Sequence, residues 1–113
     1  MLTHEEAIRY AMSLPDVYID RPFGDQYGDV LRIGQNRKIF LGAFMLHGQP
    51  VLNLKADPQW CLFWRDAYPA VIPGYHMNKE HWNSIILDGS IPDEDIHKMI
   101  DDSYRLVRKK PMK

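Results

Sequence analysis

The fold class follows from residues 38–55, which read KIFLGAFMLHGQPVLNLK. The run 38–46 is almost entirely apolar and predicts one long strand, and the sequence HGQP at 47–50 is typical of a turn. In residues 51–55, leucines alternate with an asparagine and a lysine, which is the period-two pattern of a strand with one buried face. A link this short joins strands that pair antiparallel. The segment therefore predicts part of an antiparallel meander.

Helix signals lie on both sides of this strand pair. Thr3 and Glu6 form a capping box for a helix that reaches about residue 14. Asp57-Pro58 supplies the N-cap and first-turn proline of a second helix, and a third begins near Pro92. In chain order the sequence predicts a helix, strands at 29–33, 38–46 and 51–55, a helix, extended segments at 71–77 and 81–87, and a helix, with residues 17–27 irregular.

This order predicts an α+β fold, α-β(3)-α-β(2)-α, in which helices pack on one antiparallel sheet. The chain of 113 residues is expected to form a single domain over 1–113. Its one cysteine, Cys61, allows no intrachain disulfide, and its polar, acidic start lacks the pattern of a signal peptide. Its longest apolar run is too short to span a bilayer. We therefore expect a cytoplasmic protein with no membrane partner.

The charges are unevenly distributed along the chain. The formal net charge is −1, which argues against nucleic-acid binding by the surface as a whole. Residues 105–113 contain five bases and no acid, a composition that also suits a helix C-terminus. Residues 30–55 contain no acid and four bases, which are Arg32, Arg37, Lys38 and Lys55. These predict a positive sheet edge with weak, salt-sensitive phosphate binding.

Residues 73–83, PGYHMNKEHWN, concentrate polar and aromatic side chains between two apolar runs. His76 and His81 could approach each other across a hairpin, but zinc needs further ligands and Cys61 is the only thiol. Cys61 lies in an apolar helical run, where a lone cysteine is usually a core residue. The chain has no nucleophile elbow, phosphate-binding glycine loop or dinucleotide fingerprint. The sequence therefore predicts no catalytic residue, no metal site and no cofactor.

The same stretch has two structural interpretations. In the first, a β-hairpin offers stacking faces, hydrogen-bond donors and a positive charge to a nucleic acid, from Tyr75, His76, Asn78, Lys79, His81 and Trp82. In the second, the aromatic residues pack on the sheet and the polar residues only decorate the tip. The residues alone leave both interpretations open.

Several motifs resemble those of a known family. They are Thr3-His4-Glu5-Glu6, Ala11-Met12-Ser13-Leu14-Pro15, Pro22-Phe23-Gly24, Asn53-Leu54-Lys55-Ala56-Asp57-Pro58, residues 73–83 and Ile86-Leu87-Asp88-Gly89-Ser90-Ile91-Pro92-Asp93. Over nearly the whole chain they are similar to the MmcQ/YjbR family of small bacterial proteins, and residues 73–83 are the most specific part. The resemblance implies the fold α-β(3)-α-β(2)-α, similar to that of secretion chaperones. The family is described as DNA-binding, sometimes as a double-wing motif, whereas the chaperone likeness implies protein or peptide binding.

Three functions follow as hypotheses. The first is a non-enzymatic protein that binds double-stranded DNA through Arg32, Arg37, Lys38, Lys55, Tyr75, His76, Asn78, Lys79, His81 and Trp82. The second is a module that binds a protein, a peptide or a small ligand with the sheet face and the 73–83 hairpin. A concave pocket joining Asn53, Lys55, His76 and Trp82 would favour it. The third, an enzyme with histidine acid–base chemistry, has the weakest support because no nucleophile or substrate is indicated.

Overall fold

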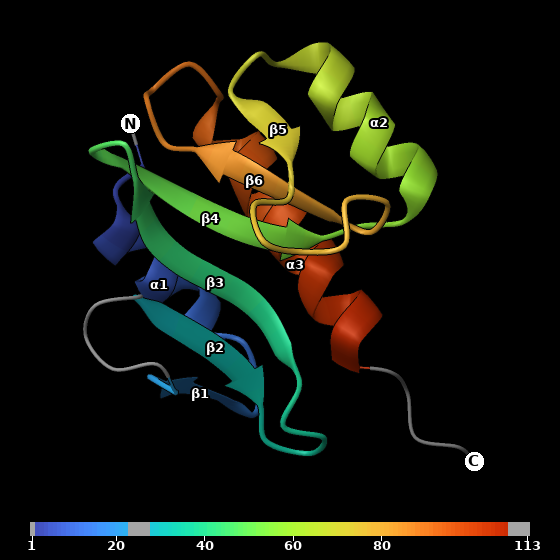
Figure 1. Cartoon of the computed structure of the whole chain (residues 1–113). Helices are drawn as coiled ribbons and strands as arrows, with labels where there is room; N and C mark the ends of the chain where they lie inside the picture. Colours follow the sequence, from blue (N-terminus) through green and yellow to red (C-terminus); the bar gives the residue numbers. More distant parts are fainter. Residues whose placement is uncertain (1, 23–27, 109–113) are drawn as a thin grey trace.

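The computed structural model describes residues 2–22 and 28–108 (Figure 1). Phe23, Gly24 and residues 109–113 of the basic tail lie outside these ranges. The described elements are, in chain order, α1 (His4–Met12), β1 (Val17–Asp20), β2 (Asp29–Ile33), β3 (Ile39–Leu46), β4 (Gln49–Lys55), α2 (Pro58–Ala67), β5 (Val71–Pro73), β6 (Trp82–Ile86) and α3 (Asp93–Arg108). The strands form one antiparallel sheet in the order β1-β2-β3-β4-β6-β5.

The hydrophobic core lies between the sheet and its helices. α3 packs on β3 and β4, α1 packs on β1, β4 and α3, and α2 packs on β5 and β6 (Figure 1). Alternate strand positions point toward the helices, including Leu52 and Leu54 of β4, and both side chains are buried. Trp64 of α2 belongs to the same cluster of buried residues. None of the described helices has the length and apolar content needed to cross a lipid bilayer.

The α+β class and the antiparallel sheet with helices packed on it are confirmed. The segment 38–55 forms β3 and β4, which pair in the middle of the sheet from Leu41 opposite Leu54 onward. The capping box is present at the start of α1. The Thr3 hydroxyl accepts from the amide of Glu6 at 3.1 Å, and Glu6 Oε1 accepts from the amide of Thr3 at 3.0 Å.

The sheet has one strand more than the sequence predicted, because residues 17–20 form β1 at its edge. Tyr18 and Ile19 are neighbours in the chain and both are exposed, so β1 lacks the alternation that identifies a half-buried strand. Tertiary contacts position it instead. The amide of Gly34 donates to the carbonyl of Asp16 at 2.7 Å, which holds the start of β1 against the end of β2.

A buried serine joins α3 to the two central strands. Ser103 Oγ donates to the carbonyl of Phe40 at 2.6 Å and accepts from the amide of Lys55 at 2.9 Å. The ring of Phe40 also meets the ring of Tyr104 edge-on, with centroids 5.3 Å apart. Because Ser103 is fully buried, these two backbone groups depend on its hydroxyl for their hydrogen bonds.

The substitution Ser103→Ala should lower the free energy of unfolding by about 1–3 kcal/mol, because the buried Phe40 carbonyl and the partly buried Lys55 amide lose a partner. The control Ser13→Ala, at the exposed end of α1, should change it by less than about 0.5 kcal/mol. Urea denaturation followed by circular dichroism measures both values. Equal stability of Ser103→Ala and the unsubstituted protein would contradict this role of the hydroxyl.

Candidate functional site

Residues 74–81, here called the covering loop, lie over the sheet face opposite to Leu52 and Leu54 (Figure 1). The predicted extended segments 71–77 and 81–87 are shorter in the structure, since β5 ends at Pro73 and β6 begins at Trp82. The reason is a change of hydrogen-bond partners. The Gly74 amide still donates to the Trp82 carbonyl at 2.9 Å, but the next residue bonds to side chains of the sheet. β5 and β6 still pair as an antiparallel hairpin, but its tip is a longer loop that lies on the sheet.

Two buried side chains hold the backbone of Tyr75 on the sheet. Ser84 Oγ accepts from the amide of Tyr75 at 2.8 Å, and Asn53 Nδ2 donates to its carbonyl at 3.1 Å. The Ser84 hydroxyl donates in turn to Asn53 Oδ1. Asn53 and Ser84 are paired across β4 and β6, so both point to the same face. Together they replace a neighbouring strand as the partner of Tyr75.

The guanidinium group of Arg65, on α2, holds the other end of the covering loop. Its Nε donates to Asn83 Oδ1 at 2.7 Å, and its Nη2 donates to the carbonyls of Lys79 and, at 3.3 Å, Trp82. The side-chain Nδ2 of Asn83 donates back to the backbone carbonyl of Cys61 on α2 at 3.2 Å. The several donors of a planar guanidinium group suit this arrangement. α2 and the covering loop are thereby tied together.

The backbone at the start of the covering loop allows little variation. A Cβ atom on Gly74 would lie 2.8 Å from the Cβ of Trp82, so the two strands approach too closely for a side chain. His76 has a φ of 59°, in the left-handed region that non-glycine residues rarely occupy. The Tyr75 ring stacks on Phe44, with centroids 5.9 Å apart, and lies 4.1 Å from the His76 ring. The loop therefore presents Tyr75 and His76 as an exposed aromatic pair.

The six predicted hairpin residues have different environments. Lys79 Nζ donates to the carbonyl of Gly74 at 2.9 Å, and Asn78 Oδ1 accepts from the amide of Glu80 at 2.9 Å, so both side chains help to close the loop. Four of the six are exposed, namely Tyr75, His76, Asn78 and Lys79, and two are half-buried, namely His81 and Trp82.

Arg32, predicted as a phosphate contact, is engaged inside the protein. Its Nε donates to Asp20 Oδ2 at 2.7 Å, and its Nη1 donates to the carbonyl of Arg37 at 2.7 Å. It therefore joins β2 to β1 and closes the β2–β3 turn. The exposed charges of this turn come from the side chains of Arg37 and Lys38.

The sheet topology brings the other predicted cations to one end of the sheet. The β2–β3 turn carries Arg37 and Lys38, and the antiparallel register places the end of β4, at Lys55, at the same end. Lys55 is paired with Trp82, the first residue of β6, which directly follows the covering loop and its Lys79. The β2–β3 turn, the end of β4 and the covering loop are distant in the chain and thus lie toward the same end of the sheet.

The last turn of α3 lies at this same end. Asn36 Nδ2, in the β2–β3 turn, donates to the carbonyl of Val107 at 2.9 Å, and this contact brings the exposed Arg108 beside the turn. Arg108 also lies over the Tyr104 ring, 5.8 Å from its centroid. We call five cations the basic end: Arg37, Lys38, Lys55, Lys79 and Arg108.

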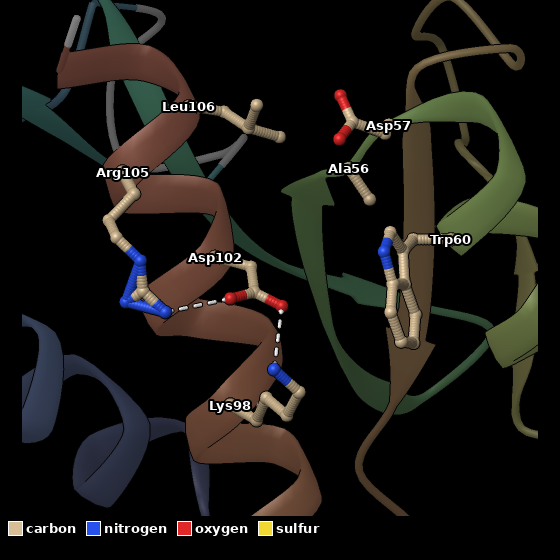
Figure 2. A pocket seen from close by; sticks show the side chains of 7 residues that line it. All are labelled: Ala56, Asp57, Trp60, Lys98, Asp102, Arg105 and Leu106. Atoms are coloured by element: carbon tan, nitrogen blue, oxygen red, sulfur yellow. Dashed lines mark hydrogen bonds and ion pairs between the residues drawn. The ribbon is translucent and has the colours of Figure 1, made fainter.

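A pocket of about 300 Å³ opens between α2 and α3 (Figure 2). Asp102 accepts from Lys98 Nζ at 3.3 Å and from Arg105 Nη2 at 2.9 Å. The residues that line this α2–α3 pocket are Ala56, Asp57, Trp60, Lys98, Asp102, Arg105 and Leu106. A second pocket lies on the outer side of α2 and is lined by Leu62, Phe63, Arg65 and Asp66. Neither of these two pockets is the predicted one, which would join Asn53, Lys55, His76 and Trp82.

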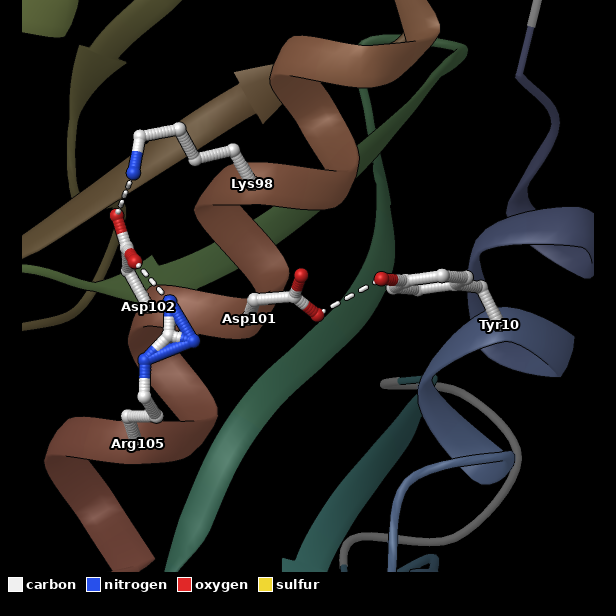
Figure 3. A network of polar contacts seen from close by, with 5 residues as sticks. All are labelled: Tyr10, Lys98, Asp101, Asp102 and Arg105. Atoms are coloured by element: carbon white, nitrogen blue, oxygen red, sulfur yellow. Dashed lines mark hydrogen bonds and ion pairs between the residues drawn. The ribbon is translucent and has the colours of Figure 1, made fainter.

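On another face, α3 is fastened to α1. The Tyr10 hydroxyl donates to Asp101 Oδ1 at 2.8 Å (Figure 3). The Tyr10 ring also stacks on His97, with centroids 4.0 Å apart. Burial, and then the hydrogen bond to Asp101, raises the pKa of the Tyr10 hydroxyl. The two adjacent carboxylates of α3 therefore point to different sides of the helix. Asp101 faces α1, and Asp102 faces the α2–α3 pocket.

The predicted core position of Cys61 is confirmed, since its side chain is 1% exposed. Burial raises the pKa of the thiol, which keeps it protonated at neutral pH. His76 and His81 do not belong to a metal cluster in the part of the chain that the structure describes, where no three His, Cys, Asp or Glu side chains come together.

Sequence reasoning missed Arg65 and Ser84, which position the covering loop. No local signal identifies Arg65, because its partners lie 14 to 18 residues further along the chain. Ser84 follows Asn83 and directly precedes the apolar residues Ile85 and Ile86 of β6, and a buried hydroxyl in a strand does indicate a hydrogen-bond partner on that face.

The substitution Arg65→Lys should loosen the covering loop, because an ammonium group cannot reproduce the fork of guanidinium donors. The amides of Gly74 and His81 should exchange with deuterium about tenfold faster or more, in line with the loss of charge-assisted hydrogen bonds. Hydrogen exchange followed by NMR measures this. The control Arg9→Lys, exposed on α1, should leave both rates unchanged, and unchanged rates in Arg65→Lys would contradict the role of Arg65.

Several known proteins are similar to this chain in sequence. The chain is 44% identical over 104 residues to the uncharacterized protein YbdF of Escherichia coli O157:H7. This alignment covers 92% of the chain and 83% of YbdF. It is 40% identical over 63 residues to the uncharacterized protein YyaQ of Bacillus subtilis. This alignment covers 55% of the chain and 52% of YyaQ.

Two crystal structures have the same fold. Protein DR2400 of Deinococcus radiodurans superposes with a TM-score of 0.88 at 31% identity, over 100% of this chain and 83% of the other. A protein from Pseudomonas syringae superposes with a TM-score of 0.83 at 29% identity, over 95% of this chain and 100% of the other.

The model of the YjbR family matches residues 12–106. The chain therefore belongs to the MmcQ/YjbR family.

Proposed function

We propose that the basic end binds the phosphate backbone of DNA. The observation that carries the proposal is that lysine and arginine residues of four segments lie toward one end of the sheet, namely those of the β2–β3 turn, the end of β4, the covering loop and the last turn of α3. Lysine and arginine contacts to phosphate oxygens supply most of the sequence-independent affinity for DNA. The net charge of the whole chain is only −1, so the attraction would be local to this end.

The groups around the basic end support weak binding without enzymatic chemistry. An ammonium group has three donors, so the bond from Lys79 to Gly74 still leaves it able to contact a phosphate. Tyr75 and His76 are exposed at the start of the covering loop, beside Phe44 of β3, and offer aromatic faces to a bound strand. The carboxylate of Glu80, exposed beside Lys79, reduces the positive field. The proposal is therefore a low-affinity, salt-sensitive interaction.

Protein binding is a second candidate, favoured by the outer side of α2. The side chains of Leu62 and Phe63 are exposed there, and the Phe63 ring is in edge-on contact with the exposed Trp60 of the α2–α3 pocket, with centroids 5.0 Å apart. Neighbouring exposed apolar side chains are typical of interaction surfaces. Leu62 and Phe63 are not part of the basic end, so substitutions at the two places separate the two functions.

At low salt the protein should bind a fluorescently labelled DNA duplex, and its affinity should fall steeply as salt is added. If all five cations contact phosphates, log K should fall against log salt with a slope of about −4 to −5, because each contact contributes roughly −0.9. Fluorescence anisotropy measures this slope. Absence of binding at low salt would overturn the proposed function.

Reversal of single charges should show which segments take part. Lys38→Glu in the β2–β3 turn and Lys79→Glu in the covering loop should each weaken duplex binding and make the salt slope shallower by about one. The control Arg9→Glu makes the same change of charge on α1 and should leave the slope unaltered. If Lys79→Glu keeps full affinity, the covering loop is not a contact.

A further inference from the structure

We infer that the α2–α3 pocket receives one unpaired nucleobase, so that the protein prefers single-stranded nucleic acid to a duplex. The inference rests on the proposed function, because the phosphates of the same strand would contact the basic end. It adds a stacking site to the charges already described. Three properties of the pocket carry it, namely its aromatic wall, its balanced charges and its position.

The aromatic wall of the pocket is Trp60, whose side chain is 39% exposed (Figure 2). Two rings of the same helix support it. Phe63 meets Trp60 edge-on with centroids 5.0 Å apart, and Trp64, which is buried, lies 6.2 Å away. A braced indole that is still accessible is a suitable platform for a base, and stacking of one base on an aromatic side chain is worth about 1–3 kcal/mol.

The charges of the pocket favour a neutral polar ring over a free anion. Asp57 and Asp102 contribute two negative charges, and Lys98 and Arg105 contribute two positive charges, so the formal sum is zero. A phosphate group in the pocket would meet both carboxylates. A nucleobase presents donors and acceptors on one planar edge, which the carboxylates and the cations can both satisfy.

Lys98 now occupies the space in front of the indole, with its Nζ 5.7 Å from the centroid of Trp60. This face of the ring is therefore covered by the ammonium group, which a stacking base must displace. The Lys98 side chain is 50% exposed, and its ion pair with Asp102 is long, at 3.3 Å. A surface pair of this kind contributes little stability, so a stacking base can displace the ammonium group at small cost.

The position of the pocket connects it to the basic end. Ala56 in its wall directly follows Lys55, and Arg105 lies about one helical turn before Arg108. A strand whose phosphates contact Lys55 and Arg108 can therefore turn a base into the pocket. In a duplex the base is paired and stacked between its neighbours, and entry would require the cost of unpairing it. Selectivity for an unpaired strand follows.

The test compares three probes of equal length by anisotropy at low salt, namely an oligothymidylate, an oligouridylate and a DNA duplex. Trp60→Ala should lower the single-strand affinity about 5- to 100-fold, in line with the loss of one stacked base, and should leave the duplex affinity unchanged. Trp60→Phe keeps a stacking face and should retain most of the affinity. The two single-stranded probes distinguish DNA from RNA as the bound strand.

The matched control is Leu62→Ala, which removes an exposed apolar side chain from the same helix but outside this pocket. It should behave as the unsubstituted protein toward all three probes. Equal single-strand affinities of Trp60→Ala and Leu62→Ala would overturn the inference and leave the proposed function standing, provided that Lys38→Glu still weakens binding. If Trp60→Ala lost the same fraction of its affinity for the duplex as for the single strands, the inference would also be overturned. Absence of binding to every probe would overturn both the inference and the proposed function.

Discussion

The alternation of side chains along β4 constrains the rest of the structure. Leu52 and Leu54 are buried against the helices, and the period of two in a strand then directs Asn53 to the opposite face. A buried amide needs hydrogen-bond partners, and Asn53 finds them in Ser84 and in the backbone of Tyr75. Packing on one face of the sheet thus requires the covering loop on the other.

The covering loop in turn determines what the end of the sheet presents to solvent. It is anchored on the sheet face by side chains of β4 and β6 and on its other side by Arg65 of α2. These anchors belong to regular elements, which hold functional groups more rigidly than a free hairpin would. Lys79 consequently has a defined position, and the aromatic pair of Tyr75 and His76 is held over the sheet beside Phe44. The same helix that supplies Arg65 also supplies Trp60 to the α2–α3 pocket.

Membership of a family and of a fold does not by itself assign a function, because unrelated functions occur on one fold. What the domain can bind therefore depends on which of its charged side chains are available at the surface. Arg32 and Lys38 illustrate the difference, since they lie within one turn of the chain and have the same formal charge. Arg32 is held by Asp20 and by the carbonyl of Arg37, whereas Lys38 is exposed. Asp20 belongs to β1, a strand that the sequence did not predict, so the sequence alone could not show that Arg32 is engaged.

The sequence by itself determined the features that depend on nearby residues. The capping box at Thr3, the start of α2 at Asp57-Pro58 and the pairing of β3 with β4 follow from local hydrogen bonding and short-range periodicity. The family also follows from local motifs, above all residues 73–83.

Tertiary structure alone decided the features that depend on distant partners. β1 has no apolar alternation and exists because β2 pairs with it. The covering loop folds back because Asn53, Ser84 and Arg65 bond to it. The basic end forms because antiparallel register and the contact from Asn36 to α3 place four separate segments toward the same end of the sheet. Hydrogen bonds between residues far apart in the chain leave no periodic signal, so only the folded chain shows which polar side chains are used internally and which remain at the surface.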